Sequence, residues 1–303
     1  VLVGAGIMSA TLAVLLKELD PMLKVKMFET LDQPALESSH AWNNAGTGHA
    51  ALCELNYTPE KSDGSIDISR ALQINTEFDL SRQFWSYLVK NGSIKNPQTF
   101  IHPVPHYSFV NGADSVNFLR KRFHALSSHH CFHGMEFSDD KKQIEQWIPL
   151  VMEGRSAQEI VAATRMVTGT DVDYGALTTL LIDSLKNRPD FSVDYFHRVR
   201  DLDRVGKIWK IDVKDDRSGE HKYVSARFVF IGAGGGSLPL LQKSSIAEAK
   251  GYAGFPVSGI WLRCDNDQLS SRHNGKVYGK AAVGSPPMSV PHLDSRHIDG
   301  KTS

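Results

Sequence analysis

The sequence predicts an α/β fold with two domains, and three observations support this prediction. The chain has 303 residues, enough for about two domains of common size. It opens with an apolar strand pattern, a helix pattern and a second strand pattern, which together form a compact β-α-β unit. A later series of strand patterns ends, like the first strand, on glycines. Hydrophobic residues make up 41% and charged residues 22%, which is typical of a globular protein with a sizeable core.

The elements of the first half follow from hydrophobic periodicity and turn residues. Strand 1–3 runs directly into helix 7–19, Pro21 ends this helix, and strand 25–28 follows. The stretch 30–58 is polar and rich in Asn, Gly and Ser, so we expect a long loop, and loops of this length are usually functional. We also expect helices over 67–90 and 115–126 and a strand at 106–110.

The second half begins with a strand around 159–164. Asp173 then caps a helix over 174–187, which Pro189 stops. We expect further strands within 190–202, 207–216 and 222–236, joined by turn residues at 215–219, and short strands at 257–264 and 276–282 before a proline-rich loop at 285–294. Val1 starts inside a strand pattern, no signal peptide precedes it, and the tail stops without a closing element. We therefore expect a fragment of a longer protein.

The first strand-to-helix turn predicts dinucleotide binding rather than a plain structural turn. Gly4 allows a tight turn, and Gly6 lets the backbone approach a pyrophosphate at the amino end of the helix. Ser9 takes the place of the third glycine and is small enough for close packing of helix and strand. Glu29 follows Ser9 by 20 residues (29 − 9), the spacing at which an acid accepts a hydrogen bond from a ribose hydroxyl.

Two further stretches favour FAD over NAD. The run FVFIGAGGGS, residues 228–237, is a second apolar strand that ends in glycines and is expected to pass close to the middle of the cofactor. A simple NAD dehydrogenase does not need it, although a buried strand with a flexible turn into a helix is the alternative interpretation. The loop 37–54 interleaves hydroxyl and amide side chains with glycine and can lie along a phosphate-ribityl chain.

Charge and cysteine content exclude other classes. Lys plus Arg and Asp plus Glu both number 34, so no broad basic field indicates nucleic acid as a partner. Three cysteines far apart indicate neither a disulfide framework nor a zinc site and fit a reducing compartment. Four histidines surround one of them, and because no paired element accompanies this tract we predict a solvated loop and no metal site. These residues are His124, His129, His130, His133 and Cys131.

The chain closely resembles the malate:quinone oxidoreductases, a branch of the FAD-dependent oxidoreductases related to glycine oxidase and 2-hydroxyglutarate dehydrogenase. The stretches WNNAGTGHAALCELNYT, TGTDVDYGALT, FVFIGAGGGSLPLLQKS and KVYGKAAVGSPPMSVPHLDSR carry this resemblance. It implies non-covalent FAD, oxidation of (S)-malate to oxaloacetate, and electron delivery to membrane quinone by a peripheral protein on the cytoplasmic face of the inner membrane. It also implies a missing carboxyl-terminal part, without which this fragment is not expected to hold FAD securely.

The resemblance also implies the domains and the cofactor contacts. A discontinuous, Rossmann-like FAD-binding domain would comprise 1–55 and 150–245, and an incomplete α+β substrate domain 56–149 and 246–303. The implied FAD-binding residues are Gly4, Gly6, Ser9, Glu29, Ser38, Ser39, Asn43, Asn44, Gly46, Thr47, Gly232, Ala233 and Gly234.

Malate oxidation needs a base for the hydroxyl proton and cationic groups for two carboxylates. A neutral histidine suits the first task, and His49 and His292 are both candidates. Arg296 is the preferred candidate clamp, because arginine binds carboxylates bidentately. Further assignments remain open: Arg263 is a clamp or a surface partner of Asp265, Asp294 orients His292 or caps a turn, and His106 could line the pocket.

Three rival functions remain. One keeps FAD but oxidises 2-hydroxyglutarate or an amino acid, the second is a truncated, non-catalytic flavin-fold remnant, and the third and weakest is a soluble NAD dehydrogenase.

Overall fold

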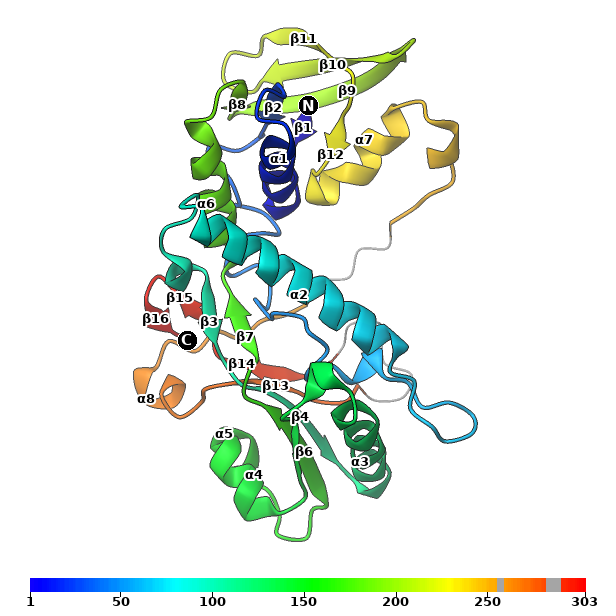
Figure 1. The fold of residues 1–303 in the computed structure, drawn as a ribbon, viewed down its shortest axis with the longest axis vertical. Helices are drawn as coiled ribbons and strands as arrows, with labels where there is room; N and C mark the ends of the chain where they lie inside the picture. The colour runs from blue at the N-terminus through cyan, green and yellow to red at the C-terminus, as the bar shows by residue number, and fades with distance from the viewer. Residues whose placement is uncertain (255–258, 282–289) are drawn as a thin grey trace. The chain divides into compact units, whose positions relative to one another are not determined.

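The computed structural model describes residues 1–254, 259–281 and 290–303 and divides into two compact units (Figure 1). The first unit comprises Val1–Asn44, Asn91–Asn96 and Asp173–Pro256, and the second comprises Ala45–Lys90, Pro97–Val172 and Val257–Ser303. Residues 45–55 and 150–172, predicted to belong to the FAD-binding domain, thus group with the second unit, whereas residues 91–96 and 246–254, predicted to belong to the substrate domain, group with the first. Of the proline-rich loop expected at 285–294, residues 285–289 lie outside the described residues, and His292–Asp294 form a strand instead of a loop, because they pair with Lys276–Tyr278.

A four-stranded, all-parallel sheet forms the centre of the first unit, in the order β12-β1-β2-β8. Its strands are β1 (Leu2–Val3), β2 (Val25–Phe28), β8 (Phe191–Asp194) and β12 (Phe230–Ile231). Helices α1 (Ile7–Leu19) and α6 (Tyr174–Lys186) pack against each other, and α7 (Ser237–Lys243) follows β12. The predicted cap of α6 is confirmed, because the Asp173 carboxylate accepts a hydrogen bond from the Ala176 N–H.

An antiparallel meander completes this unit, with the strands β9 (His197–Val205), β10 (Ile208–Asp215) and β11 (His221–Ala226). Its apolar face meets the parallel sheet in a core that includes Phe28, Val199, Ile211 and Leu240. The sequence pattern at 222–236 is divided between two sheets, because β11 pairs with β10 whereas β12 pairs with β1.

The second unit is an α+β arrangement around a five-stranded mixed sheet in the order β14-β13-β4-β6-β5. Its strands are β4 (His106–Asn111), β5 (Glu136–Ser138), β6 (Val161–Met166), β13 (Lys276–Tyr278) and β14 (His292–Asp294). Smaller pairs are β3 (Ile101–Pro103) with β7 (Thr170–Val172), and β15 (His297–Ile298) with β16 (Lys301–Thr302). The helices are α2 (Ser69–Lys90), α3 (Ala113–Ser127), α4 (Lys141–Trp147), α5 (Pro149–Met152) and α8 (Asp267–Ser270).

The strand predicted at 257–264 is wrong over its described part. Residues 259–266 have no regular secondary structure. The apolar side chains that suggested a strand face solvent, since Ile260 and Leu262 are 94% and 96% exposed. An apolar run without a partner strand cannot satisfy its backbone hydrogen bonds as a sheet, which explains the failure.

Candidate functional site

Two glycine turns lie side by side at the carboxyl end of the parallel sheet. Strand β1 pairs with β12 so that Val3 is opposite Ile231, and the Gly232 N–H donates to the Val3 carbonyl at 2.9 Å. Gly4 has a φ of +87°, and a Cβ built on it would lie 2.6 Å from the Gly232 carbonyl oxygen. Only glycine combines this backbone conformation with so close an approach. The expected convergence of the two glycine-ended strands is therefore present.

The same turns leave no room for side chains between strand and helix. A Cβ on Gly232 would lie 2.2 Å from the Ser9 hydroxyl oxygen. Ser9 is fully buried on α1, and its hydroxyl has no hydrogen-bond partner within the described part of the chain. Ser9 thus occupies the close-packed position expected of the third glycine, with an unpaired donor beside the turn.

The amino end of α1 is surrounded by polar groups of the first unit. The Ile7 N–H donates to the Ser39 hydroxyl at 3.0 Å, and the Ala5 N–H donates to Glu29 Oε2 at 2.6 Å. Glu29 Oε1 accepts a second hydrogen bond, from the Leu31 N–H at 2.9 Å. The carboxylate therefore sits at the end of β2 beside the helix start, and its remaining lone pairs can accept from a ribose hydroxyl.

The loop 37–44 also reaches the second glycine turn. A Cβ on Gly234 would lie 3.6 Å from the Ser38 hydroxyl, which places Ser38 beside that turn. The amides of Asn43 and Asn44 instead hold the loop itself together, by donating to the main-chain carbonyls of Glu37 and Ser38. The predicted cofactor residues Gly46 and Thr47 belong to the second unit.

In the second unit, the candidate base His49 is paired with a buried carboxylate. His49 Nδ1 lies 2.5 Å from Glu54 Oε1, and the two side chains are 47% and 4% exposed. Burial alone would raise the pKa of Glu54, but the hydrogen bond from His49 and the charges of His49 and His106 lower it from 4.5 to about 2. Ionised Glu54 can only accept, so Nδ1 carries the proton and Nε2 is the nitrogen that can take one up.

A buried arginine fixes the backbone around Glu54. Arg122 donates to the Thr58 hydroxyl at 3.0 Å and to the Ala51 carbonyl at 3.1 Å. The side chain is completely buried, and burial lowers its pKa to about 10. The Cys53 N–H adds a hydrogen bond to Glu54 Oε2 at 3.2 Å. The loop that carries His49 is therefore anchored at its far end.

The second candidate base, His292, has the same kind of partner. Its Nδ1 lies 2.6 Å from Asp294 Oδ2, so Asp294 does orient this ring. The ring stacks on Tyr278 at 4.7 Å between centroids and meets the edge of Trp261 at 4.8 Å. Tyr278 in turn shares a hydrogen bond of 2.8 Å with Thr47, which connects β13 to the loop. With a side chain 20% exposed, His292 is more enclosed than His49.

Arg296, the candidate clamp, belongs to a buried ion cluster. Arg296 Nε and Lys276 Nζ lie 3.0 Å and 2.9 Å from Asp171 Oδ1, and the His297 N–H donates to Asp171 Oδ2 at 2.7 Å. Burial opposes ionisation of Asp171, but the hydrogen bond from His297 and the two cations outweigh it and lower its pKa. The Arg296 guanidinium packs on Gly46, where a Cβ would lie 2.4 Å from Cζ.

The remaining candidates, His106 and Arg263, make their contacts with other residues of the chain. His106 is completely buried, with Nε2 3.0 Å from the Thr170 carbonyl oxygen, and burial lowers its pKa. Arg263 pairs with Asp265 at 2.6 Å on the surface, as the alternative interpretation expected. No spacing in the sequence pointed to four of the partners of the candidate residues, which are Glu54, Asp171, Lys276 and Tyr278.

The chain matches known proteins along its whole length. A family model described as malate:quinone oxidoreductase (Mqo) matches residues 1–303. A probable malate:quinone oxidoreductase of Bradyrhizobium diazoefficiens is 65% identical over 304 residues, which cover 100% of this chain and 59% of that protein. One from Bordetella avium is 62% identical, with 100% and 61% covered. The chain thus spans about 60% of the length of the curated relatives it matches.

Solved structures share the fold at low identity. L-proline dehydrogenase from P. horikoshii superimposes with a TM-score of 0.59 at 12% identity, covering 92% of this chain and 63% of that one. Glycine oxidase from Geobacillus kaustophilus gives 0.56 at 16% identity, with 80% and 56% covered. The Rossmann-like α/β fold predicted from the sequence is confirmed. Among the described residues, none of the helices has both the length and the apolar character needed to span a bilayer.

Proposed function

The chain belongs to the malate:quinone oxidoreductase family, and from this premise we propose that its protein oxidises (S)-malate to oxaloacetate with FAD and passes the electrons to membrane quinone. The resemblance inferred from the sequence is thereby confirmed. Because the chain spans about 60% of its relatives, the activity is proposed for the whole protein. Peripheral association with the cytoplasmic face of the inner membrane is part of the same proposal.

The observation that supports FAD is the pair of adjacent glycine turns at the amino end of α1. Gly4 and Gly232 let the two turns approach each other closely at the amino end of α1, where the positive end of the helix dipole favours an anion such as a diphosphate. The unpaired Ser9 hydroxyl and the Glu29 carboxylate fit a phosphate oxygen and a ribose hydroxyl. When bound, FAD would supply the hydride acceptor of the reaction.

We assign the base to His49. Glu54 holds the proton on Nδ1, so that Nε2 can accept the hydroxyl proton of malate as the carbinol carbon loses its hydride. The greater exposure of His49, 47% against 20% for His292, favours it as the residue that meets substrate. His292 is the alternative base, since Asp294 orients it in the same way.

Arg296 has a different role in this proposal from the clamp expected at first. Its side chain is 8% exposed, is ion-paired with Asp171 and packs on Gly46. These contacts favour a role in holding the Gly46 turn.

The test is malate-dependent dye reduction by purified full-length protein. We expect His49→Ala to lower the rate by about 10²–10⁴-fold, the usual contribution of a general base. His292→Ala should lower it less, and His124→Ala on the exposed face of α3 serves as the control. Normal rates in both the His49 and the His292 variants would reject both base assignments.

Cofactor and substrate class are tested separately. The purified protein should be yellow and should release free FAD on denaturation, and a colourless protein would contradict the flavin assignment. Turnover of 2-hydroxyglutarate or an amino acid in place of malate would support the rival oxidase. Recovery of the protein in washed membranes, and its release by salt or alkali, tests the peripheral location.

A further inference from the structure

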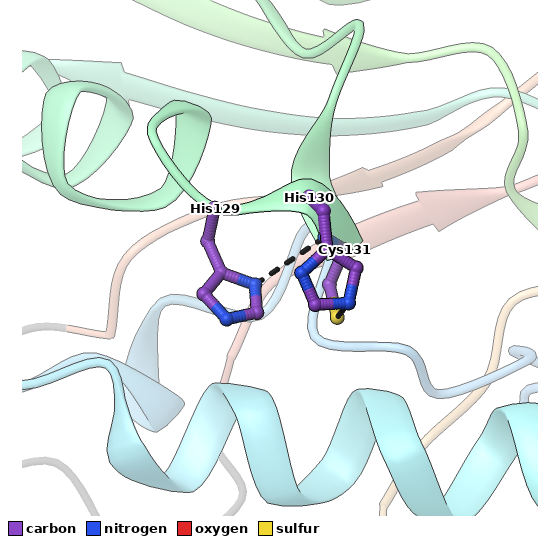
Figure 2. A group of neighbouring side chains, drawn as sticks. All are labelled: His129, His130 and Cys131. Carbon is purple, nitrogen blue, oxygen red and sulfur yellow. Dashed lines mark hydrogen bonds between the residues drawn. The ribbon is translucent and has the colours of Figure 1, made fainter.

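Three consecutive side chains gather on a tight turn of the second unit, after α3. The turn is the short helix η3 (His130–Phe132) together with His129 (Figure 2). His130 Nε2 lies 3.5 Å from Cys131 Sγ, and the rings of His129 and His130 are 4.3 Å apart between centroids. One ligand atom from each of His129, His130 and Cys131 lies within 4.8 Å of the other two.

These separations suit a tetrahedral metal ion. With zinc–sulfur and zinc–nitrogen bonds of about 2.3 Å and 2.0–2.1 Å, two neighbouring ligand atoms at the tetrahedral angle are about 3.5 Å apart. The observed separation of His130 Nε2 and Cys131 Sγ is 3.5 Å, so these two atoms already span one edge of such a site. The third atom, at up to 4.8 Å, needs only a rotation of its side chain.

We propose that His129, His130 and Cys131 form a binding site for a borderline-soft divalent transition metal, with Zn²⁺ as the typical occupant. Two imidazoles and a thiolate are ligands that zinc prefers, whereas Mg²⁺ and Ca²⁺ prefer oxygen. Three protein ligands leave the fourth tetrahedral position to water.

A cavity beside the turn has space for that water, and a second structural element, helix α2, also lines it. His130 and Cys131 line a cavity of about 210 Å³ together with Asp79 and Arg82 of α2. The sequence around the turn contains no paired element and so predicts a solvated loop, whereas the fold brings α2, which is distant in the sequence, beside the turn. Asp79 is itself paired with Arg82 at 3.4 Å, so α2 contributes both a carboxylate and a guanidinium to the lining of the cavity.

Metal binding would remove the thiol proton of Cys131. Burial, together with the charge of Asp79, raises the pKa of the Cys131 thiol. A metal–sulfur bond therefore forms as the sulfur–hydrogen bond breaks, and the thiol proton leaves to solvent. The Cys131 N–H donates to His129 Nδ1 at 3.3 Å, so His129 either gives up this weak hydrogen bond or binds through Nε2.

Cobalt spectroscopy tests the site without any need for activity or FAD. Titration of the purified protein with Co²⁺ should produce a thiolate-to-cobalt charge-transfer band, which excess Zn²⁺ removes. Cys131→Ser should abolish the band, and His129→Ala and His130→Ala should each weaken binding by at least about tenfold. Cys264→Ser and His133→Ala are matched controls that should leave it unchanged. Absence of the band in the wild type, or its persistence in Cys131→Ser, would overturn the proposal.

Thiol alkylation gives a second readout that does not depend on the folding of any variant. Zn²⁺ should slow the alkylation of Cys131 in the native wild-type protein by at least about tenfold, measured by peptide mass spectrometry. Cys264 is exposed and provides the internal control, whose rate should not change. Equal effects of Zn²⁺ on both cysteines, or no effect on either, would refute a site at Cys131.

Discussion

Replacement of Glu54 by Gln removes the charge that holds His49 and leaves a side chain of nearly the same shape. Glu54 is 4% exposed, accepts from His49 and Cys53, and has its pKa lowered from 4.5 to about 2. A lowered pKa means that ionised Glu54 stabilises the folded state at neutral pH. This contribution is lost as the pH falls, first because the unfolded chain takes up a proton near pH 4.5 and finally because the folded protein does so near pH 2.

The size of the effect follows from the two pKa values. The shift of about 2.5 units corresponds to about 3 kcal/mol in total, of which about 2 kcal/mol is already lost at pH 3. The wild type should therefore lose about 2 kcal/mol more stability than Glu54→Gln between pH 7 and pH 3. The direction is fixed, because glutamine does not titrate in this range.

Urea unfolding of both proteins at several pH values between 7 and 3 measures this difference. The exposed Glu145 on α4 provides the control, since Glu145→Gln should follow the wild type within about 0.5 kcal/mol. A constant gap between wild type and Glu54→Gln across the range would show that Glu54 is not held ionised by its neighbours. In the dye-reduction assay, Glu54→Gln should also lower kcat and shift the pH profile, whereas a purely structural role would leave the profile in place.

Three further substitutions test the first unit and the surface. Gly4→Ala places a Cβ 2.6 Å from the Gly232 carbonyl oxygen at a φ of +87°, so we expect the free energy of unfolding to fall by about 2–5 kcal/mol and FAD to be lost. Gly235→Ala is the control, because its Cβ would meet open space, and it should keep both its stability and its FAD. Lys17→Met removes the buried ammonium that donates to the main-chain carbonyls of Pro21, Leu23 and Pro189. We expect the free energy of unfolding in urea to fall by roughly 3 kcal/mol, and an unchanged value would refute the bridging role of Lys17. Arg263→Ala removes only an exposed ion pair and should change stability and the malate KM little, within about 0.5 kcal/mol; a large rise in KM would revive it as a clamp.

The sequence predicted well those parts of the fold that depend on local chemistry. Helix 7–19 has the predicted ends, because Pro21 and the glycine turn determine them over a few residues. Strand β2 pairs with β1, its neighbour in the sequence, and on its other edge with β8, which begins at Phe191; no local signal indicates a pairing over the second distance. The strand predicted at 257–264, which is absent over its described residues 259–264, shows the opposite limit, because hydrophobicity alone does not supply a neighbouring strand.

In the candidate site too, features that depend on local sequence could be predicted, whereas contacts between distant residues could not. The need for glycine at position 4 could be predicted because a tight turn and a close backbone approach leave a mark on the sequence itself. Asp294, two residues from His292, could be proposed as its partner from the sequence. Glu54 and Asp171 could not be assigned to their partners, because the sequence contains many acidic residues and no spacing distinguishes these two. Asp171 and Lys276 are over one hundred residues apart in the sequence and meet only because β7 and β13 belong to the same unit.

The ion cluster around Asp171 decides how a mutation of Arg296 should be interpreted. Arg296 and Lys276 both pair with the buried carboxylate of Asp171, so replacing Arg296 removes a buried ion pair as well as any contact with a substrate. Loss of activity in Arg296→Ala would therefore fit both a clamp and a support for Gly46. Arg296→Lys keeps the charge but loses the planar group that packs on Gly46. If Arg296 supports the turn, this variant should unfold at a lower temperature and keep its malate KM within about threefold, whereas a rise of KM by tenfold (about 1.4 kcal/mol) at unchanged stability would establish the clamp.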